Sequence, residues 1–136
     1  MEQVHLLLGD SDFLVERARG RVVDEIRAGR EGVAVTTMNA AELTPSELLE
    51  VLSPSLFGED RIAVIRHAEA AGKEPAGLVL QAAADPGPGI YLVVEHTGGG
   101  RAKQLAGRLK KVAAVHDAAP PSQRELPAWV AAEFRL

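Results

Sequence analysis

The sequence predicts a three-layer α/β domain, built on a mostly parallel sheet of five strands with helices on both faces. Five short apolar runs alternate along the chain with helical patterns, and this alternation is typical of parallel sheets. The length of 136 residues suits one domain, and a composition that is 46% hydrophobic can build a core. The predicted strands are residues 4–8, 33–38, 61–66, 90–94 and 112–116.

The first strand and helix have well-marked boundaries. Residues 4–8 form a compact apolar run that ends at Gly9, as in a buried parallel strand. Asp10, Ser11 and Asp12 can cap a helix over residues 12–28, which glycines at 29 and 32 end. The residues of its predicted apolar stripe are Phe13, Leu14, Ala18, Val22 and Ile26.

A capping box marks the second helix. Thr44-Pro45-Ser46-Glu47 places a threonine at the N-cap, a proline at the first helical position and a glutamate three residues after the cap. Residues 33–38 before it are rich in β-branched side chains and are predicted as a strand. The apolar face of the helix is expected to consist of Leu48, Leu49, Val51 and Leu52.

The second half of the chain continues the alternation. Gly72 and Glu74-Pro75 open a predicted helix over residues 76–84, which a proline- and glycine-rich turn at 85–89 ends. A last helix is expected from Ser122, with Trp129 and Phe134 on an apolar face that suits a core or a domain interface. Because the chain stops within that pattern and lacks a C-cap signal, we expect a domain from a longer protein.

Composition narrows the class of protein. The absence of cysteine excludes disulfides, thiolate metal sites and cysteine nucleophiles. No signal peptide is recognisable, and no apolar run approaches the roughly 20 residues of a membrane helix. We therefore expect a cytoplasmic domain that does not contact membranes. The net charge of −4 argues against a domain that grips nucleic acid by itself.

The junction after the first strand is where α/β proteins often bind phosphate. A P-loop needs a glycine-rich run that ends in Gly-Lys-Ser/Thr, so that backbone amides and a lysine surround the phosphate. This junction reads Gly9-Asp10-Ser11-Asp12-Phe13, with one glycine, no lysine and two carboxylates. The carboxylates suit helix capping, and nucleotide binding is not expected here.

An enzyme or a metal-binding domain is the alternative. Imidazole and carboxylate side chains fall at or near the predicted carboxyl ends of the strands, where open sheets collect ligands. Neither a metal-ligand spacing such as His-x-x-x-His nor a nucleophile motif accompanies them. The residues concerned are Asp10, His67, His96, His116 and Asp117.

The helix predicted over residues 101–111 has Leu105 and Leu109 facing inward and holds a concentration of basic residues. These cations can contact a phosphate backbone, and the glycines at 98–100 give the segment freedom to adjust. The simpler interpretation is a solvated helix face, because no aromatic side chains are interleaved for base stacking. The basic residues are Arg101, Lys103, Arg108, Lys110 and Lys111.

The segment between the second helix and the third strand is the most distinctive of the sequence. Ser53 can cap a new helical turn, Pro54 suits its first position, and Gly58 can close it. So short a turn has little room to bury both Leu56 and Phe57. The pair is either a plug into the chain's own core or an anchor for another protein, and the residues alone leave both open.

The sequence of this segment and of the strand after it is similar to a motif of a known protein family. Ser55-Leu56-Phe57-Gly58-Glu59-Asp60-Arg61, followed by the strand Ile62-Ala63-Val64-Ile65, resembles the clamp-contacting segment of the bacterial DNA polymerase III delta subunit. Three further pieces agree in order and spacing, and the likeness spans the N-terminal domain of that family. These pieces are Leu6-Leu7-Leu8-Gly9-Asp10 with Phe13-Leu14-Val15-Glu16, Tyr91-Leu92-Val93-Val94, and Leu126-Pro127-Ala128-Trp129-Val130.

The resemblance implies a clamp-loader domain, over residues 1–136, with a P-loop NTPase or AAA+-like fold and no functional nucleotide site. Its partner would be the sliding clamp, the beta subunit of the polymerase, whose ring the family's subunit helps to open. The hydrophobic wedge of the family falls on Leu56 and Phe57, and Ser55 and Gly58 would shape the turn. Other clamp-loader subunits would bind parts of the parent chain absent here. No catalytic residue, metal or cofactor is implied for this domain.

Overall fold

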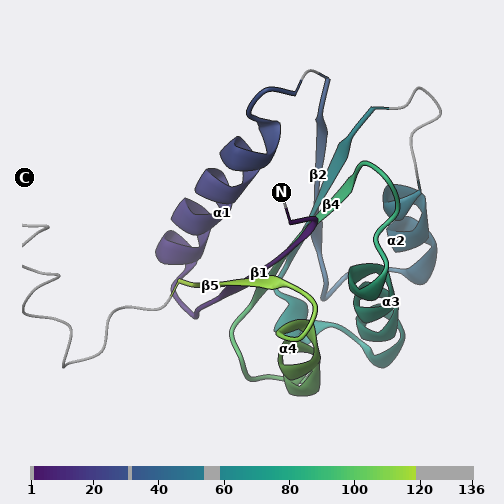
Figure 1. Ribbon diagram of the computed structural model, residues 1–136. Coiled ribbons are helices and arrows are strands. Elements are labelled where there is room, and N and C mark those ends of the chain that lie inside the picture. Colours follow the sequence, from purple (N-terminus) through teal and green to yellow (C-terminus); the bar gives the residue numbers. More distant parts are fainter. Residues whose placement is uncertain (1, 31, 54–58, 119–136) are drawn as a thin grey trace, which may run out of the picture.

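The computed structural model describes residues 2–30, 32–53 and 59–118, and a five-stranded sheet lies at its centre (Figure 1). The strand order is β2-β3-β4-β1-β5, and every neighbouring pair is parallel. The predicted five-stranded α/β fold is therefore confirmed. The strands are β1 (Val4–Leu8), β2 (Ala34–Asn39), β3 (Arg61–Arg66), β4 (Ile90–His96) and β5 (Ala114–Asp117).

Helices cover both faces of the sheet and give the domain three layers (Figure 1). Helix α1 (Asp12–Arg27) lies on one face. Helices α2 (Pro45–Leu52), α3 (Lys73–Ala84) and α4 (Lys103–Leu109) lie on the other, and a short 3₁₀ turn, η1 (Ala68–Ala70), follows β3. Within the described ranges, no helix is long and apolar enough to cross a bilayer.

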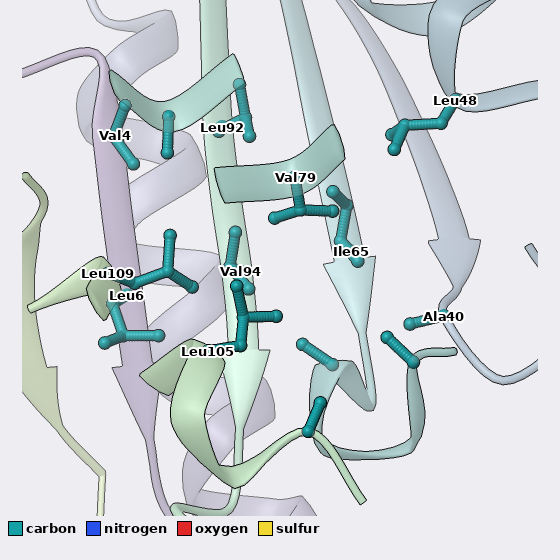
Figure 2. Packing of buried hydrophobic residues seen from close by; sticks show 14 of the residues in the cluster. Val4, Leu6, Ala40, Leu48, Ile65, Val79, Leu92, Val94, Leu105 and Leu109 are labelled. Atoms are coloured by element: carbon teal, nitrogen blue, oxygen red, sulfur yellow. The ribbon is translucent and has the colours of Figure 1, made fainter. Parts of the chain in front are cut away.

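Each face of the sheet has its own hydrophobic core. On the α1 face, Val22 and Ile26 pack with Ile62, Val64 and Val93 of the central strands. The opposite core is larger, and Figure 2 shows Val79 of α3 and Leu105 and Leu109 of α4 close to side chains of β1, β3 and β4. Because β4 is covered on both faces, all 7 of its residues are buried.

Local capping signals set the starts of α1 and α2 as expected. The Ser11 hydroxyl accepts from the Leu14 amide at the start of α1, and the Thr44 hydroxyl accepts from the Glu47 amide at the start of α2. Helix α3 begins earlier than predicted, at Lys73, with Gly72 as its N-cap. Proline at the third helical position is tolerated because the first-turn amides have no intrahelical acceptor.

The predicted burial of two residues is wrong. Phe13 is 66% exposed and Leu49 is 55% exposed, although both were expected on buried helix stripes. The inward stripe of α1 begins at Val15, two positions after Phe13, and two positions are about 200° around a helix. In α2 the fully buried side chain is Leu48, so its neighbour Leu49 faces away from the sheet.

The parallel strands give the sheet two distinct edges. We call the residues that lead into the strands, including Gln3, Asp60 and Gly89, the amino edge. The carboxyl edge consists of the strand ends and the residues immediately after them, including Gly9 and Asp10 after β1 and Thr97 after β4. The segment between α2 and β3 belongs to the amino edge, opposite the edge where open α/β sheets bind ligands.

Candidate functional site

The predicted wedge and its turn, Pro54 and Ser55-Leu56-Phe57-Gly58, lie outside the described residues, as do Trp129, Phe134 and the predicted last helix. We call residues 54–58 the wedge segment, and the structure describes the residues on both sides of it. On one side Ser53 follows the last turn of α2, and on the other Glu59 and Asp60 lead into β3. The contacts of these flanking residues define the part of the candidate site that the structure describes.

Arg61 ties the end of α2 to the beginning of β3. Its Nη1 donates to the carbonyl oxygens of Glu50, Val51 and Ser53, at 3.2, 3.4 and 3.1 Å. The last carbonyls of a helix have no intrahelical donor, and a cation is favourable at that end of the helix dipole. One guanidinium therefore supplies donors to the carbonyl groups at the end of α2 and holds Ser53, which precedes the wedge segment.

Ser53 ends α2 and is held by it. Its hydroxyl donates to the Leu49 carbonyl oxygen at 2.7 Å, and its amide donates to the Glu50 carbonyl oxygen at 3.3 Å. The helical turn that Ser53 was expected to cap falls outside the described residues. Ser53 is thus anchored on its helix side.

Asp60 anchors the far side of the segment through Arg30. The Asp60 carboxylate lies 3.3 Å from Arg30 Nε, and the backbone carbonyl of Asp60 accepts from the Ala34 amide at the start of β2. Arg30 lies over the Tyr91 ring, 5.2 Å from its centroid, and donates to the Tyr91 hydroxyl at 3.0 Å. Asp60 is thereby joined to the end of α1 and to β4.

Gly89 completes this anchor at the start of β4. It has a φ of +74°, which favours glycine, and a Cβ at this position would lie 2.8 Å from Asp60 Oδ1. The Gly89 carbonyl accepts from the Arg61 amide at 2.8 Å. Both ends of the wedge segment are therefore fixed to the domain by Arg61, Asp60 and their partners. The sequence analysis did not predict an anchoring role for Arg30, Tyr91 or Gly89, because their partners are distant in the chain.

At the carboxyl edge, two of the groups beside the usual phosphate position already form hydrogen bonds. The Gly9 amide donates to the His96 carbonyl oxygen at 3.1 Å, and Ser11 caps the first turn of α1. A Cβ added at Gly9 would lie 3.0 Å from the Ala118 carbonyl carbon, so Ala118 closes over this junction. A cavity of about 380 Å³ lies beside it, and Asp10 and Asp117 line it together with Lys103 and Lys110.

A buried ion network closes the α1 side of the carboxyl edge. The Glu95 side chain is 6% exposed and lies 2.8 Å from Arg19 Nη1 and 3.3 Å from Arg66 Nε. It joins α1, β3 and β4 through one carboxylate. A buried carboxylate needs such partners because desolvation without them is costly. The arrangement holds the layers together.

The histidines of the enzyme alternative are not gathered into one site. His96 is buried, and its Nε2 donates to the Ala102 carbonyl oxygen while its Nδ1 accepts from the Gly98 amide, both at 2.8 Å. His67 Nδ1 lies 3.4 Å from Glu69. In the described parts of the chain, no group of three or more His, Asp or Glu residues could hold a metal ion. The geometry does not favour this alternative.

His116 instead pairs with His5, which the sequence did not single out. His5 Nδ1 and His116 Nε2 are 3.0 Å apart, and the two rings are stacked. His5 Nε2 lies 2.9 Å from the Glu2 carbonyl oxygen, so this nitrogen carries the proton and Nδ1 accepts from His116. Burial lowers the pKa of His5 from its ordinary value, and the hydrogen bond to the Glu2 carbonyl offsets only part of this effect.

The predicted basic residues lie on α4 and its flanks, and all five are exposed. Lys103 and Lys110 reach the cavity at the carboxyl edge. Arg101, Lys103 and Arg108 line a second hollow, between α3 and α4. The structure thus divides the basic segment between two surfaces.

Solved structures share this fold. The Bacillus subtilis DNA clamp loader delta protein (YqeN) matches with a TM-score of 0.65 over 95% of this chain and 42% of that chain, at 16% sequence identity. The Thermotoga maritima RuvB Holliday junction branch migration motor matches with a TM-score of 0.57 over 96% of this chain and 43% of that chain, at 15% identity. The likeness confirms the predicted resemblance at the level of the fold.

A third neighbour is a DNA polymerase III gamma subunit-related protein of Thermotoga maritima, with a TM-score of 0.51 and 16% identity. It is matched over 95% of this chain and 45% of its own. The chain therefore spans less than half the length of each of these three structures. No protein-family model matches the sequence, and no curated protein does.

Proposed function

We propose that this chain is the clamp-binding domain of a clamp-loader delta-type subunit and takes part in loading the sliding clamp during DNA replication. The proposal is supported by the occurrence of one sequence motif together with one fold. The Leu56-Phe57 motif that resembles the delta wedge falls between α2 and β3, in a domain whose fold is shared with a solved clamp loader delta protein. Neither the motif nor the fold would support this function alone.

In this proposal Leu56 and Phe57 insert into an apolar pocket of the clamp, and Ser55 and Gly58 shape the turn that presents them. Full burial of a large apolar side chain is worth about 1.5–3 kcal/mol, so the pair can contribute several kcal/mol to binding. The contacts of Arg61 and Asp60 support this role, because a segment fixed at both ends loses less conformational entropy when it binds.

The domain itself neither hydrolyses nor binds nucleotide in this proposal. The engaged Gly9 amide and the absence of a P-loop lysine from Gly9 to Phe13 favour that interpretation. The remaining domains of the parent protein would bind the other clamp-loader subunits, and the cytoplasm would be the site of action. Contact with DNA through Arg101, Lys103, Arg108, Lys110 and Lys111 would be weak and secondary, because the domain carries a net charge of −4.

The test is a titration of the chain against the sliding clamp of the same organism. Phe57→Ala should weaken binding by at least about thirtyfold, since truncation of a hot-spot anchor costs about 2 kcal/mol or more. The double variant Leu56→Ala, Phe57→Ala should weaken it further and keep the melting temperature. Phe13→Ala is the matched control, because Phe13 is exposed at the opposite edge of the sheet.

The same variant separates an anchor from a core plug. Truncation of a core phenylalanine costs about 3–5 kcal/mol of stability. If Phe57→Ala lowers the melting temperature and leaves clamp binding unchanged, Phe57 belongs to the core and the proposal fails. It also fails if Phe13→Ala weakens binding as much as Phe57→Ala does.

A further inference from the structure

A groove of about 810 Å³ is lined by residues of α3, of α4 and of the turns that precede these two helices. Its bottom is apolar, since Leu105 is 5% exposed and Ala102 is 9% exposed while both line the groove. Ala76 and Leu80 of α3, both partly buried, continue this apolar strip. An occupant therefore has to bring apolar side chains of its own to cover it.

Four exposed cations surround the groove: Lys73 from α3, and Arg101, Lys103 and Arg108 from α4 and the turn before it. No carboxylate lines the groove, and within the described residues none of the four cations forms an ion pair. In a chain with a net charge of −4, this is a marked local excess of positive charge. The complementary ligand is anionic.

Gly77 lines the groove on its α3 side and has no side chain that could narrow it. It is an exposed helical glycine, and a Cβ at this position would meet nothing within 4 Å. Glycine inside a helix costs about 0.5–1 kcal/mol relative to alanine, so the position forgoes helix stability and leaves the groove open. A second helix laid in a groove requires this kind of close approach.

We propose that this groove docks an acidic, amphipathic helix of a partner protein. Apolar side chains of such a helix would cover Leu80 and Leu105, and its carboxylates would meet Arg101, Lys103 and Arg108. Nucleic acid suits the groove less well. A phosphate backbone leaves the apolar strip uncovered, and no aromatic side chain lines the groove for base stacking. The inference goes beyond the proposed clamp contact and does not depend on the wedge segment.

The test uses a labelled 18-residue helical peptide with leucines along one face and glutamates along the other, followed by fluorescence anisotropy. The chain should bind this peptide and should bind a version with glutamine in place of glutamate at least tenfold more weakly. Arg101→Glu combined with Arg108→Glu should weaken binding of the acidic peptide by at least tenfold. A 20-nucleotide single strand of DNA is the competing probe.

Gly77→Gln is the decisive variant, because it adds a side chain at a residue that lines the groove and leaves the charge of the groove unchanged. It should weaken peptide binding at least tenfold and should not lower the melting temperature, since glutamine favours a helix more than glycine does. Gly20→Gln is the matched control. Gly20 is also an exposed helical glycine with open space around its Cβ, but it lies in α1 on the other face of the sheet.

Three results would overturn the proposal. The first is an acidic peptide that does not bind at a concentration of the chain near 1 mM. The second is peptide binding that Gly77→Gln leaves unchanged. The third is single-stranded DNA that binds more tightly than the peptide and is unaffected by Gly77→Gln, which would assign the cations to a nucleic acid surface.

Discussion

The two edges of the sheet contain similar ion pairs and hydrogen bonds, but these contacts have different structural roles. At the carboxyl edge, Glu95 is buried between Arg19 and Arg66, His96 is satisfied at both ring nitrogens, and the Gly9 amide is taken by a backbone carbonyl. These contacts join neighbouring elements to one another. They lie at the edge from which open α/β sheets commonly bind ligands.

At the amino edge, the contacts converge on the two sides of a single segment. Arg61 holds the helix end before it, and Asp60 with Arg30 holds the strand start after it. Contacts at the carboxyl edge close the fold, whereas those at the amino edge hold the residues on both sides of segment 54–58. If so, changes at the carboxyl edge should affect stability, and changes at the amino edge should affect partner binding.

The largest loss of stability is expected at the carboxyl edge. Glu95→Ala removes the buried carboxylate and leaves Arg19 and Arg66 without their partner, and because both arginines are partly exposed the loss should be about 1.5–3 kcal/mol. Urea unfolding measures the loss. Glu16→Ala is the control, because the Glu16 side chain is 71% exposed at 3.9 Å from Arg19 and should cost little. Equal losses in the two variants would contradict a structural role for Glu95.

A smaller and different effect is expected for Arg61→Ala at the amino edge. Loss of its three carbonyl contacts should cost about 1–2 kcal/mol of stability and, in the proposed function, weaken clamp binding about tenfold. Arg61→Lys should recover part of both, since lysine keeps the charge without the planar fork. Clamp binding by Arg61→Ala at the affinity of the original chain would show that the anchor does not matter for recognition.

The His5–His116 pair should add a modest pH dependence to stability. The pKa of His5 is lowered in the folded domain, while the unfolded chain has the ordinary value of about 6.5. Below about pH 6.5 the unfolded state therefore binds more protons, and the free energy of unfolding should fall by at most about 1.4 kcal/mol per pH unit. His5→Gln should reduce the slope of urea-unfolding stability between pH 7 and 5, and an unchanged slope would contradict this account.

No effect at all is expected from ATP. The Gly9 amide is engaged, and residues 9–13 lack the glycines and the lysine of a P-loop, so calorimetry with ATP and magnesium should give no binding heat. The matched injection without magnesium is the control. Micromolar, magnesium-dependent binding would place a ligand at the carboxyl edge and remove the contrast between the edges.

Much of the fold was predictable because its signals are local. The strand at residues 61–66 and the start of α2 at Pro45 were predicted as the structure has them, since an apolar run and a capping box depend on neighbouring residues. The end of β4 was not, because Glu95 and His96 are polar and the predicted strand stopped at residue 94. Their burial depends on Arg19, Arg66 and the Ala102 carbonyl, which are distant in the sequence or set by the fold.

The candidate site was predictable in part for the same reason. The motif at Leu56 and Phe57 is contiguous and was visible as a pattern, and it remains a prediction because it lies outside the described residues. The anchors were not visible. Nothing in the sequence connects Arg30 with Asp60 or Gly89 with Arg61, since these pairs meet only when α1, β3 and β4 are packed together.

Hydrogen exchange of the chain with and without the sliding clamp tests the central claim most directly, because it reports which edge the partner covers. The account predicts slowed exchange in peptides that cover residues 53–60 and unchanged exchange at Gly9-Asp10 and Thr97-Gly98, with the protection lost in the double variant Leu56→Ala, Phe57→Ala. Protection at the carboxyl edge, with residues 53–60 exchanging as in the free chain, would contradict it.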